Sequence, residues 1–118
     1  MLEYYKIRTK KIKLIEKYNI FKEIPIDKSE EKFFEIFKNE NIKIEKIVSN
    51  GQKSPDNFWY EQEKSEYILL LSGYAILECE AFEIELFKGD YLNIEAFKKH
   101  RVKFTSLDEP TIWFAVFY

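Results

Sequence analysis

Two ionisable residues carry the chemistry that a buried site would need. His100 is the only histidine of the chain, and an imidazole can accept or donate a proton near neutral pH. Glu66 begins an apolar run, where a buried carboxylate requires a partner. We predict that the stretches 59–73 and 89–104 face each other, which brings Glu66 and His100 into one pocket. There they would form either an acid–base pair or a hydrogen-bonded polar pair, unless Glu66 faces solvent at the start of its strand.

Aromatic and amide side chains extend this candidate site. Tyr60 and Gln62 share a face if their segment is extended, so Tyr60 is a candidate proton donor or ligand contact, or it only lines the mouth. Trp113 and Tyr118 near the end of the chain can stack on a ligand or pack against a second subunit. Cys79 lies between two glutamates, which disfavour a thiolate, so we expect an unreactive thiol.

Short apolar runs, spaced about ten residues apart without a helical segment between them, predict a β-sandwich or barrel. In the run HRVKFT, the side chains of His100, Val102 and Phe104 are expected to point inward, and those of Arg101 and Lys103 outward. The first strand is expected from Ile42 to Asn50-Gly51, and the later ones span Tyr67–Leu71, Tyr74–Cys79, Phe82–Phe87, Tyr91–Ile94, Arg101–Thr105 and Ile112–Phe117. The strands at 67–71 and 112–117 are apolar on both faces and need a cover outside the barrel.

The N-terminal part has a different pattern. Asp27 or Ser29 can cap a helix whose apolar face holds Phe33, Ile36 and Phe37, and this helix is expected to end at residues 39–41. Residues 4–18 fit a helix or an extended arm, and residues 19–26 an extended connector. We therefore predict an N-terminal extension, residues 1–41, with one amphipathic helix, followed by a β-barrel, residues 42–118.

Composition limits the class of protein and its partners. The 118 residues suffice for one domain, and a single cysteine excludes an intrachain disulfide and favours a reducing, cytoplasmic setting. No run is apolar enough for a membrane span. Residues 1–19 carry a net charge of +4, which leaves −6 on the rest, so the basic arm could dock on another macromolecule, but we do not expect nucleic acid. We predict a homodimer through the doubly apolar strands, unless the N-terminal helix covers them.

The two facing stretches resemble the paired motifs of the cupin superfamily, which are small double-stranded β-helix barrels of the jelly-roll type. Glu66 and Gly73 stand at the spacing of the first motif, and Gly89 and His100 at that of the second. The phrases VSNGQKSPDNFWY and WFAVFY resemble those of small single-domain bacterial cupins. The resemblance implies a mainly β fold, a barrel with a short N-terminal helical extension.

Metal-binding cupins hold Fe, Mn, Ni or Zn with two histidines and a glutamate of the first motif and a histidine of the second. This chain has Tyr60 and Gln62 at the first two of these positions, and Glu95 and Phe97 where the second motif has its Pro-x-Gly turn. If any cofactor binds, the resemblance implies a divalent transition metal on Gln62, Glu66 and His100, although one imidazole, one carboxylate and one amide make a poor cage.

Two functions follow from this reading. The first is a barrel that binds a small molecule through Tyr60, Gln62, Glu66, His100 and Trp113. The second is an enzyme of isomerase, lyase or dioxygenase type, in which His100, Glu66 and Tyr60 are catalytic at a degenerate metal site or as a metal-free acid–base set.

Overall fold

Ten β-strands and no helix make up the part of the chain that the computed structural model describes, residues 4–7 and 10–118. In that part, no helix offers the length and apolarity that crossing a membrane requires. The strands are β1 (Tyr4–Ile7), β2 (Lys10–Lys13), β3 (Lys32–Lys38), β4 (Lys43–Ser49), β5 (Glu66–Ser72), β6 (Ala75–Cys79), β7 (Glu83–Leu86), β8 (Tyr91–Ile94), β9 (His100–Thr105) and β10 (Thr111–Phe117).

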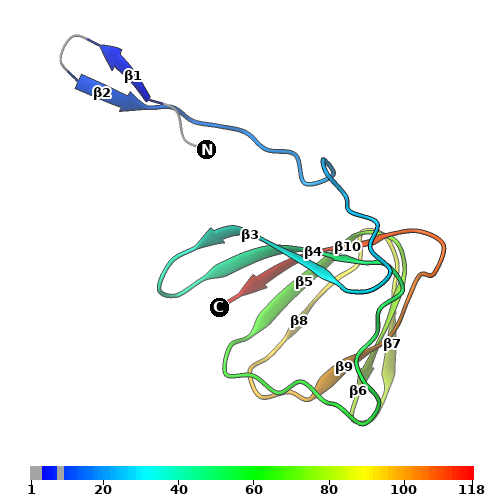
Figure 1. Ribbon diagram of the computed structural model, residues 1–118. Coiled ribbons are helices and arrows are strands. Elements are labelled where there is room, and N and C mark those ends of the chain that lie inside the picture. The colour runs from blue at the N-terminus through cyan, green and yellow to red at the C-terminus, as the bar shows by residue number, and fades with distance from the viewer. Residues whose placement is uncertain (1–3, 8–9) are drawn as a thin grey trace.

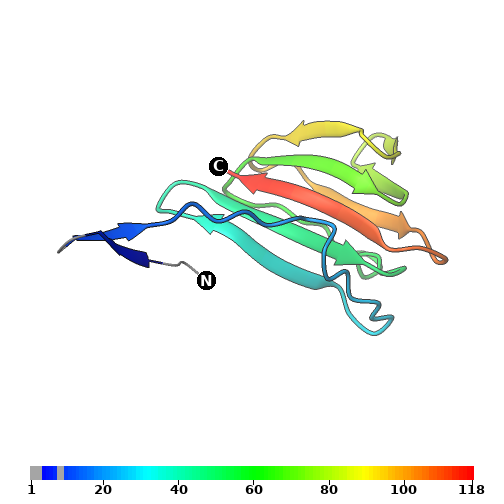
Figure 2. The ribbon, with the colours of Figure 1, turned by 90° about the horizontal axis from the view of Figure 1, so that it is seen from above.

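Two antiparallel sheets form the barrel (Figure 1). The larger sheet has the strand order β3-β4-β10-β5-β8, which Figure 2 shows side by side, and the smaller one has the order β7-β6-β9. β5 and β6 lie in different sheets, so the chain crosses between the sheets at Gly73. The φ angle of Gly73 is +88°, and a Cβ there would lie 2.6 Å from the Cα of Thr111, so only glycine fits this crossing.

The core lies between the two sheets and follows from strand alternation. On β5, Ile68 and Leu70 are buried while Tyr67 is exposed, as expected when every second side chain faces inward. The two sheets together contribute a buried apolar cluster made of Ile68, Leu70, Ala75, Leu77, Leu86, Ile94 and Trp113. The predicted barrel and each of its strands from residue 42 onward are therefore confirmed, with bounds that differ by one or two residues.

The helix predicted after Asp27 is wrong, because its residues form the edge strand β3. Phe33 pairs with Ile47 of β4, but the register shifts between Glu35 and Phe37. This bulge inserts one residue, so the apolar side chains at 33, 36 and 37 have helical spacing although the backbone is extended. Asp27 accepts hydrogen bonds from the amide and hydroxyl groups of Ser29, at 2.8 and 2.5 Å, and so closes a short turn.

A second bulge corrects the predicted faces of β9. The pairing of β6 with β9 shifts between Ile76 and Leu77, so that Leu77 faces Val102 while Ile76 faces Phe104. Val102 therefore lies on the inner face, as predicted, but Phe104 shares the outer face with Ile76. There the ring of Phe104 packs against Tyr74, with 6.0 Å between the ring centroids. A bulge reverses the alternation beyond it, and no side-chain pattern of β9 alone reports one.

Residues 22–27, which precede β3, are tied to the larger sheet by side chains of β4 and of the loop after β4. The ammonium group of Lys46 donates to the carbonyl of Lys22 at 3.3 Å, and the amide of Asn50 to that of Pro25 at 3.1 Å. The amide of Gln52 donates to the carbonyl of Asp27 at 2.9 Å. Residues 22–27 are thus fixed beside β4 as an irregular connector, and in the described residues no helix covers the outer face of the sheet.

The most N-terminal elements are β1 and β2, which pair with each other as an antiparallel two-stranded sheet. The extended alternative for residues 4–18 is therefore the correct one where the structure describes them, whereas residues 8 and 9 lie outside the described part. The division of the chain at residue 42 stays a prediction, although β3 already belongs to the five-stranded sheet.

Candidate functional site

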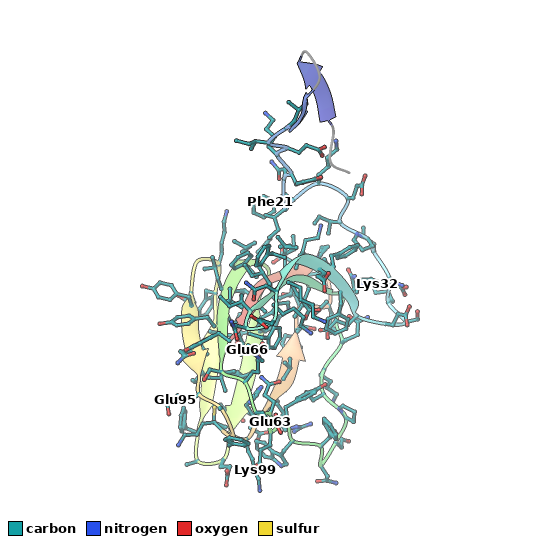
Figure 3. The ribbon with its side chains drawn as sticks, turned by 90° about the vertical axis from the view of Figure 1, so that its left-hand side faces the viewer. Phe21, Lys32, Glu63, Glu66, Glu95 and Lys99 are labelled. Carbon is teal, nitrogen blue, oxygen red and sulfur yellow. The ribbon has the colours of Figure 1, made fainter. Side chains whose placement is uncertain are left out.

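Three separate segments bring the predicted pair together at one end of the barrel. Glu66 is the first residue of β5, and His100 is the first residue of β9. Tyr60, at the end of the long loop before β5, forms a bridge with His100 through two backbone hydrogen bonds of 2.8 and 3.1 Å. Figure 3 shows Glu66 between the strands, while Glu63, Glu95 and Lys99 lie nearer the end of the molecule. The predicted facing of Glu66 and His100 is therefore observed.

The side chains of Glu66 and His100 are buried, but they form no hydrogen bond with each other. Glu66 is 9% exposed and His100 is 6% exposed. The imidazole Nδ1 lies 2.9 Å from the carbonyl of Lys98, which can only accept, so Nδ1 carries a proton and Nε2 faces Glu66. Nε2 lies 3.8 Å from Oε1 of Glu66, beyond hydrogen-bond distance. A polar group of a ligand placed between these atoms could contact both.

Gln62 and Tyr60 complete this end of the site. The amide nitrogen of Gln62 donates to Oε1 of Glu66 at 3.0 Å. The ring of Tyr60 stacks on the imidazole of His100, with 5.9 Å between centroids and 28° between planes, and Tyr60 remains 44% exposed. Gln62 thus orients the carboxyl group, while Tyr60 covers the imidazole at the mouth.

Burial determines the protonation of Glu66. Loss of hydration raises its pKa from 4.5 to about 7, while the hydrogen bond from Gln62 acts in the opposite direction. At neutral pH the carboxyl group is therefore present in both protonation states. When protonated it can donate a hydrogen bond, and when ionised it can accept a proton or bind a cation.

A cavity of about 200 Å³ extends inward from the pair. Its apolar walls come from both sheets and include Ile47, Ile68, Leu77 and Val102. The aromatic side chains that line it are Phe33, Tyr60, Trp113 and Phe117. Apolar walls with a few converging polar groups are the usual surroundings of a bound small molecule.

A second carboxyl group lines the same cavity, and our reading of the sequence did not identify it. Glu31 lies in the connector directly before β3 and accepts a hydrogen bond from the hydroxyl of Ser49. The indole N–H of Trp113 donates to that hydroxyl oxygen at 3.0 Å. Burial raises the pKa of Glu31, and the hydrogen bond from Ser49 opposes this shift. Strand alternation places Ser49 on the same face as Ile47, and this is the only sequence pattern that points to this part of the cavity. No sequence pattern indicates Glu31.

The remaining sequence candidates lie outside the cavity. The hydroxyl of Tyr118 donates to the side chain of Asn93 at 2.8 Å, and its ring stacks on Tyr67, so it does not line the site with Trp113. Cys79 pairs with His100 in the register of β6 and β9, but its thiol packs against the core. Burial raises the pKa of this thiol, which agrees with the predicted lack of reactivity.

Known structures provide the comparison that decides the family. A "putative mannose-6-phosphate isomerase" from Ralstonia eutropha JMP134 is 37% identical, with a TM-score of 0.84 over 87% of this chain and 97% of that chain. A cupin superfamily protein from Desulfitobacterium hafniense DCB-2 has a TM-score of 0.67 at 16% identity, over 80% of this chain and 82% of its own. An RmlC-like cupin from Desulfovibrio desulfuricans has a TM-score of 0.69 at 17% identity, over 88% of this chain and 97% of its own.

The chain belongs to the cupin superfamily. No protein-family model and no curated protein matches its sequence. The two more distant structures share the fold, and the predicted cupin superfamily assignment is confirmed.

The second motif of this cupin keeps the geometry of its turn without the usual glycine. Phe97 has a φ angle of +64°, the left-handed conformation that glycine adopts without strain. Its amide donates to the carbonyl of Gln62 at 2.8 Å, and the amide of Ala96 donates to the hydroxyl of Ser65 at 3.1 Å. The turn is therefore fixed against the first motif, and it holds Gln62 beside Glu66.

The loop before Tyr60 is held by Arg101 on the outer face of β9. The guanidinium group of Arg101 pairs with Glu78 at 2.9 Å and donates to the carbonyls of Ser54 and Pro55 at 3.2 and 3.0 Å. The guanidinium carbon lies 5.9 Å from the ring centroid of Trp59. These contacts fix the loop that delivers Tyr60 to the mouth, so Arg101 positions the site from outside.

The donor set does not fit the transition metal of metal-binding cupins. Gln62 directs its amide nitrogen, which cannot ligate a cation, toward Glu66. That leaves one imidazole and one carboxylate, and the described part of the chain contains no group of three His, Cys, Asp or Glu residues that could hold a metal ion. The predicted ligand set of Gln62, Glu66 and His100 therefore lacks the donors of a tight site.

Proposed function

We propose that this cupin binds a small polar molecule directly in the cavity between its sheets. The observation that carries the proposal is the buried pair of Glu66 and His100, whose facing atoms lie 3.8 Å apart at the end of a cavity of about 200 Å³. A polar pair left without a mutual hydrogen bond in such a place is ready to bond to a ligand. Gln62, Tyr60 and Trp113 supply further contacts.

Each side chain has a role that its chemistry supports. His100 has its Nδ1 proton engaged by the carbonyl of Lys98, so its Nε2 can accept a hydrogen bond from a ligand hydroxyl or amine. Glu66 can donate or accept, because its pKa of about 7 leaves both forms populated. The rings of Tyr60 and Trp113 offer apolar faces on which a ligand can stack.

A melting-shift screen against a library of small polar metabolites tests this proposal. At about a hundred times its Kd, a ligand should raise the Tm by roughly 5 °C or more. Glu66→Gln and His100→Ala should reduce this shift, whereas Glu63→Gln, an exposed glutamate of the neighbouring loop, should not. The proposal fails if no library member binds, or if each shift persists in both cavity variants.

A second candidate function is metal-free acid–base isomerisation. Two observations favour it: the pKa of Glu66 is raised to about 7 by burial, and a relative at 37% identity is described as a putative mannose-6-phosphate isomerase. An ionised Glu66 would remove a proton from the carbon beside a substrate carbonyl, whose oxygen becomes an enediol hydroxyl by accepting a proton. The same group would then return the proton to the former carbonyl carbon, while the hydroxyl group on the deprotonated carbon loses its proton and becomes the new carbonyl.

Proton exchange with solvent tests this second function. Mannose 6-phosphate incubated with the protein in D₂O should acquire deuterium at the carbon next to the carbonyl. The exchange should be lost in Glu66→Gln and retained in Glu63→Gln. Absence of deuterium in the wild-type reaction would remove this function for that substrate and leave direct binding as the proposal.

We also propose that the protein is a homodimer that pairs through the outer face of β5, β8 and β10. The connector lies beside β4, but further along the sheet an apolar groove is lined by Tyr67, Ile68, Leu69, Tyr91, Phe114 and Val116. None of these side chains is charged, so two copies related by a two-fold axis can meet there without like-charge repulsion.

Sedimentation velocity tests the homodimer. At high micromolar concentration the wild type should sediment as a dimer, and Leu69→Glu should sediment as a monomer because it places a charge in the apolar groove. Lys99→Glu changes an exposed residue at the end of the barrel and should leave the dimer intact. A compact wild-type monomer at that concentration would contradict the proposal.

A further inference from the structure

Charge is unevenly distributed inside the cavity. Two carboxyl groups line it, Glu31 and Glu66, and each is supported by neutral hydrogen-bond donors, Ser49 and Gln62 respectively. Lys53 is the one lysine that lines the cavity among the residues that the structure describes, and it is exposed. When both carboxyl groups are ionised, the cavity lining in the described residues has a negative charge that no buried lysine or arginine of that lining balances.

Neighbouring basic groups do not remove this imbalance. Lys43 lies over the ring of Phe117, 5.0 Å from its centroid, and pairs with Glu45 at 3.8 Å. His100 donates from Nδ1 to a backbone carbonyl, and its Nε2 lies 3.8 Å from Oε1 of Glu66, beyond hydrogen-bond distance. A bound cation would be attracted by both carboxylates in surroundings of low dielectric constant.

Aromatic rings surround the same space. Phe33, Tyr60, Trp113 and Phe117 come from β3, the loop before β5, and β10, so they line the cavity from several directions. The face of an aromatic ring carries negative potential and attracts ammonium groups, especially where water is excluded. An inorganic divalent ion would gain little from these rings, and the described part of the chain brings no three His, Cys, Asp or Glu residues together to hold it.

We infer that the cavity takes a small organic cation, an amine or quaternary ammonium group on a polar molecule, held by Glu31 and Glu66 among aromatic rings. This inference rests on the proposed binding function and names the class of ligand. It also predicts poor binding of phosphorylated sugars, since the exposed Lys53 is the single lysine that lines the cavity in the described residues.

Choline and its uncharged isostere 3,3-dimethylbutan-1-ol form a matched pair of probes, because they differ in charge and hardly in shape. Titration calorimetry should show that choline binds at least about tenfold more tightly than the isostere. Glu66→Gln and Glu31→Gln should each weaken choline by about tenfold and leave the isostere unchanged, while Glu63→Gln should alter neither. Both cavity variants replace a carboxyl by an amide of the same shape, which favours intact folding.

Other outcomes separate this inference from the proposed function. Equal affinity for the two probes, or no binding of choline, would overturn the inference of a cationic ligand. Mannose 6-phosphate or mannitol could instead bind in the same experiment, with the binding lost in Glu66→Gln. The cavity would then be a ligand site for another class of molecule: the proposed binding function would stand, and the inference of a cationic ligand would be wrong. Choline binding that survives both cavity substitutions would place the cation elsewhere and also overturn the inference.

Discussion

Glu66 is buried and Glu31 is half-buried in the wall of one cavity, and their surroundings differ. Glu66 begins a central strand, faces His100 and accepts a hydrogen bond from Gln62. Glu31 lies in an irregular connector and accepts from the hydroxyl of Ser49, which accepts from the indole of Trp113. Neither Ser49 nor Trp113 titrates in the physiological range.

This difference shows how one cavity can contain two carboxyl groups with separate roles. Burial raises the pKa of both groups. At Glu66 the carboxyl group can donate or accept a proton because its pKa is about 7, so this end can respond to what binds. At Glu31 the neutral chain to Trp113 fixes the carboxyl group and joins the connector to β4 and β10. We therefore propose that Glu66 serves recognition and proton exchange, and that Glu31 is a carboxyl group held in one position.

The largest expected effect concerns the pH dependence of stability at the Glu66 end. Because the folded pKa of Glu66 is about 7 and not 4.5, the folded protein binds this proton more tightly than the unfolded chain does. Stability should therefore fall as the pH rises between these two values and stay reduced above them. At about pH 8, Glu66→Gln should stabilise the protein by up to about 3 kcal/mol, and near about pH 4 it should change little.

Urea unfolding of Glu66→Gln and of the wild type over this pH range measures the effect. Glu63→Gln is the control, since an exposed carboxyl group should leave the pH profile unchanged. If the wild type and Glu66→Gln have parallel profiles, Glu66 is not buried as described, and the contrast with an ordinary exposed glutamate disappears.

At the other end, Ser49→Ala should destabilise the protein by about 1–3 kcal/mol, because it leaves the indole N–H of Trp113 and the carboxyl group of Glu31 without their shared partner. The loss should be greater at a pH where Glu31 is ionised. In a Glu66→Gln background the cost should be unchanged, since the two carboxyl groups share no hydrogen-bond partner. A marked non-additivity in urea unfolding would show that the two ends act as one network.

The smallest effect concerns the turn that supports the Glu66 end. Phe97→Gly should stabilise the protein by about 0.5 kcal/mol, because glycine relieves the left-handed conformation while its greater freedom in the unfolded chain offsets part of the gain. Phe82→Gly changes an exposed phenylalanine without a positive φ angle and should not stabilise. Loss of stability in Phe97→Gly, measured by urea unfolding, would mean that the Phe97 side chain has contacts that outweigh its strain.

The same contrast explains how much of the site could be predicted. Glu66, His100, Tyr60 and Gln62 lie on regular strands or next to them, so spacing and alternation sufficed to place them together. Glu31 lies between β3 and the connector of residues 22–27. The path of that connector depends on hydrogen bonds from Lys46, Asn50 and Gln52 to its backbone carbonyls. Such contacts leave no periodic pattern in the sequence.

Both errors in the predicted fold come from bulges. The bulge between Glu35 and Phe37 gave an edge strand the apolar spacing of a helix. The bulge in the pairing of β6 and β9 turned Phe104 to the outer face. A bulge is stabilised by the partner strand, so it belongs to tertiary structure, and local propensity does not report it. The strands from β4 to β8 have no bulge among themselves, and their alternation was predicted correctly.

The central claim is that Glu66 and His100 bind a small molecule directly and are not ligands of a resident metal ion. Elemental analysis of protein purified without an affinity tag, beside the variant His100→Ala, tests it most directly. We predict Fe, Mn, Ni and Zn well below one per chain, with no difference between the two proteins. One equivalent of any of these metals in the wild type, lost in His100→Ala, would contradict the claim.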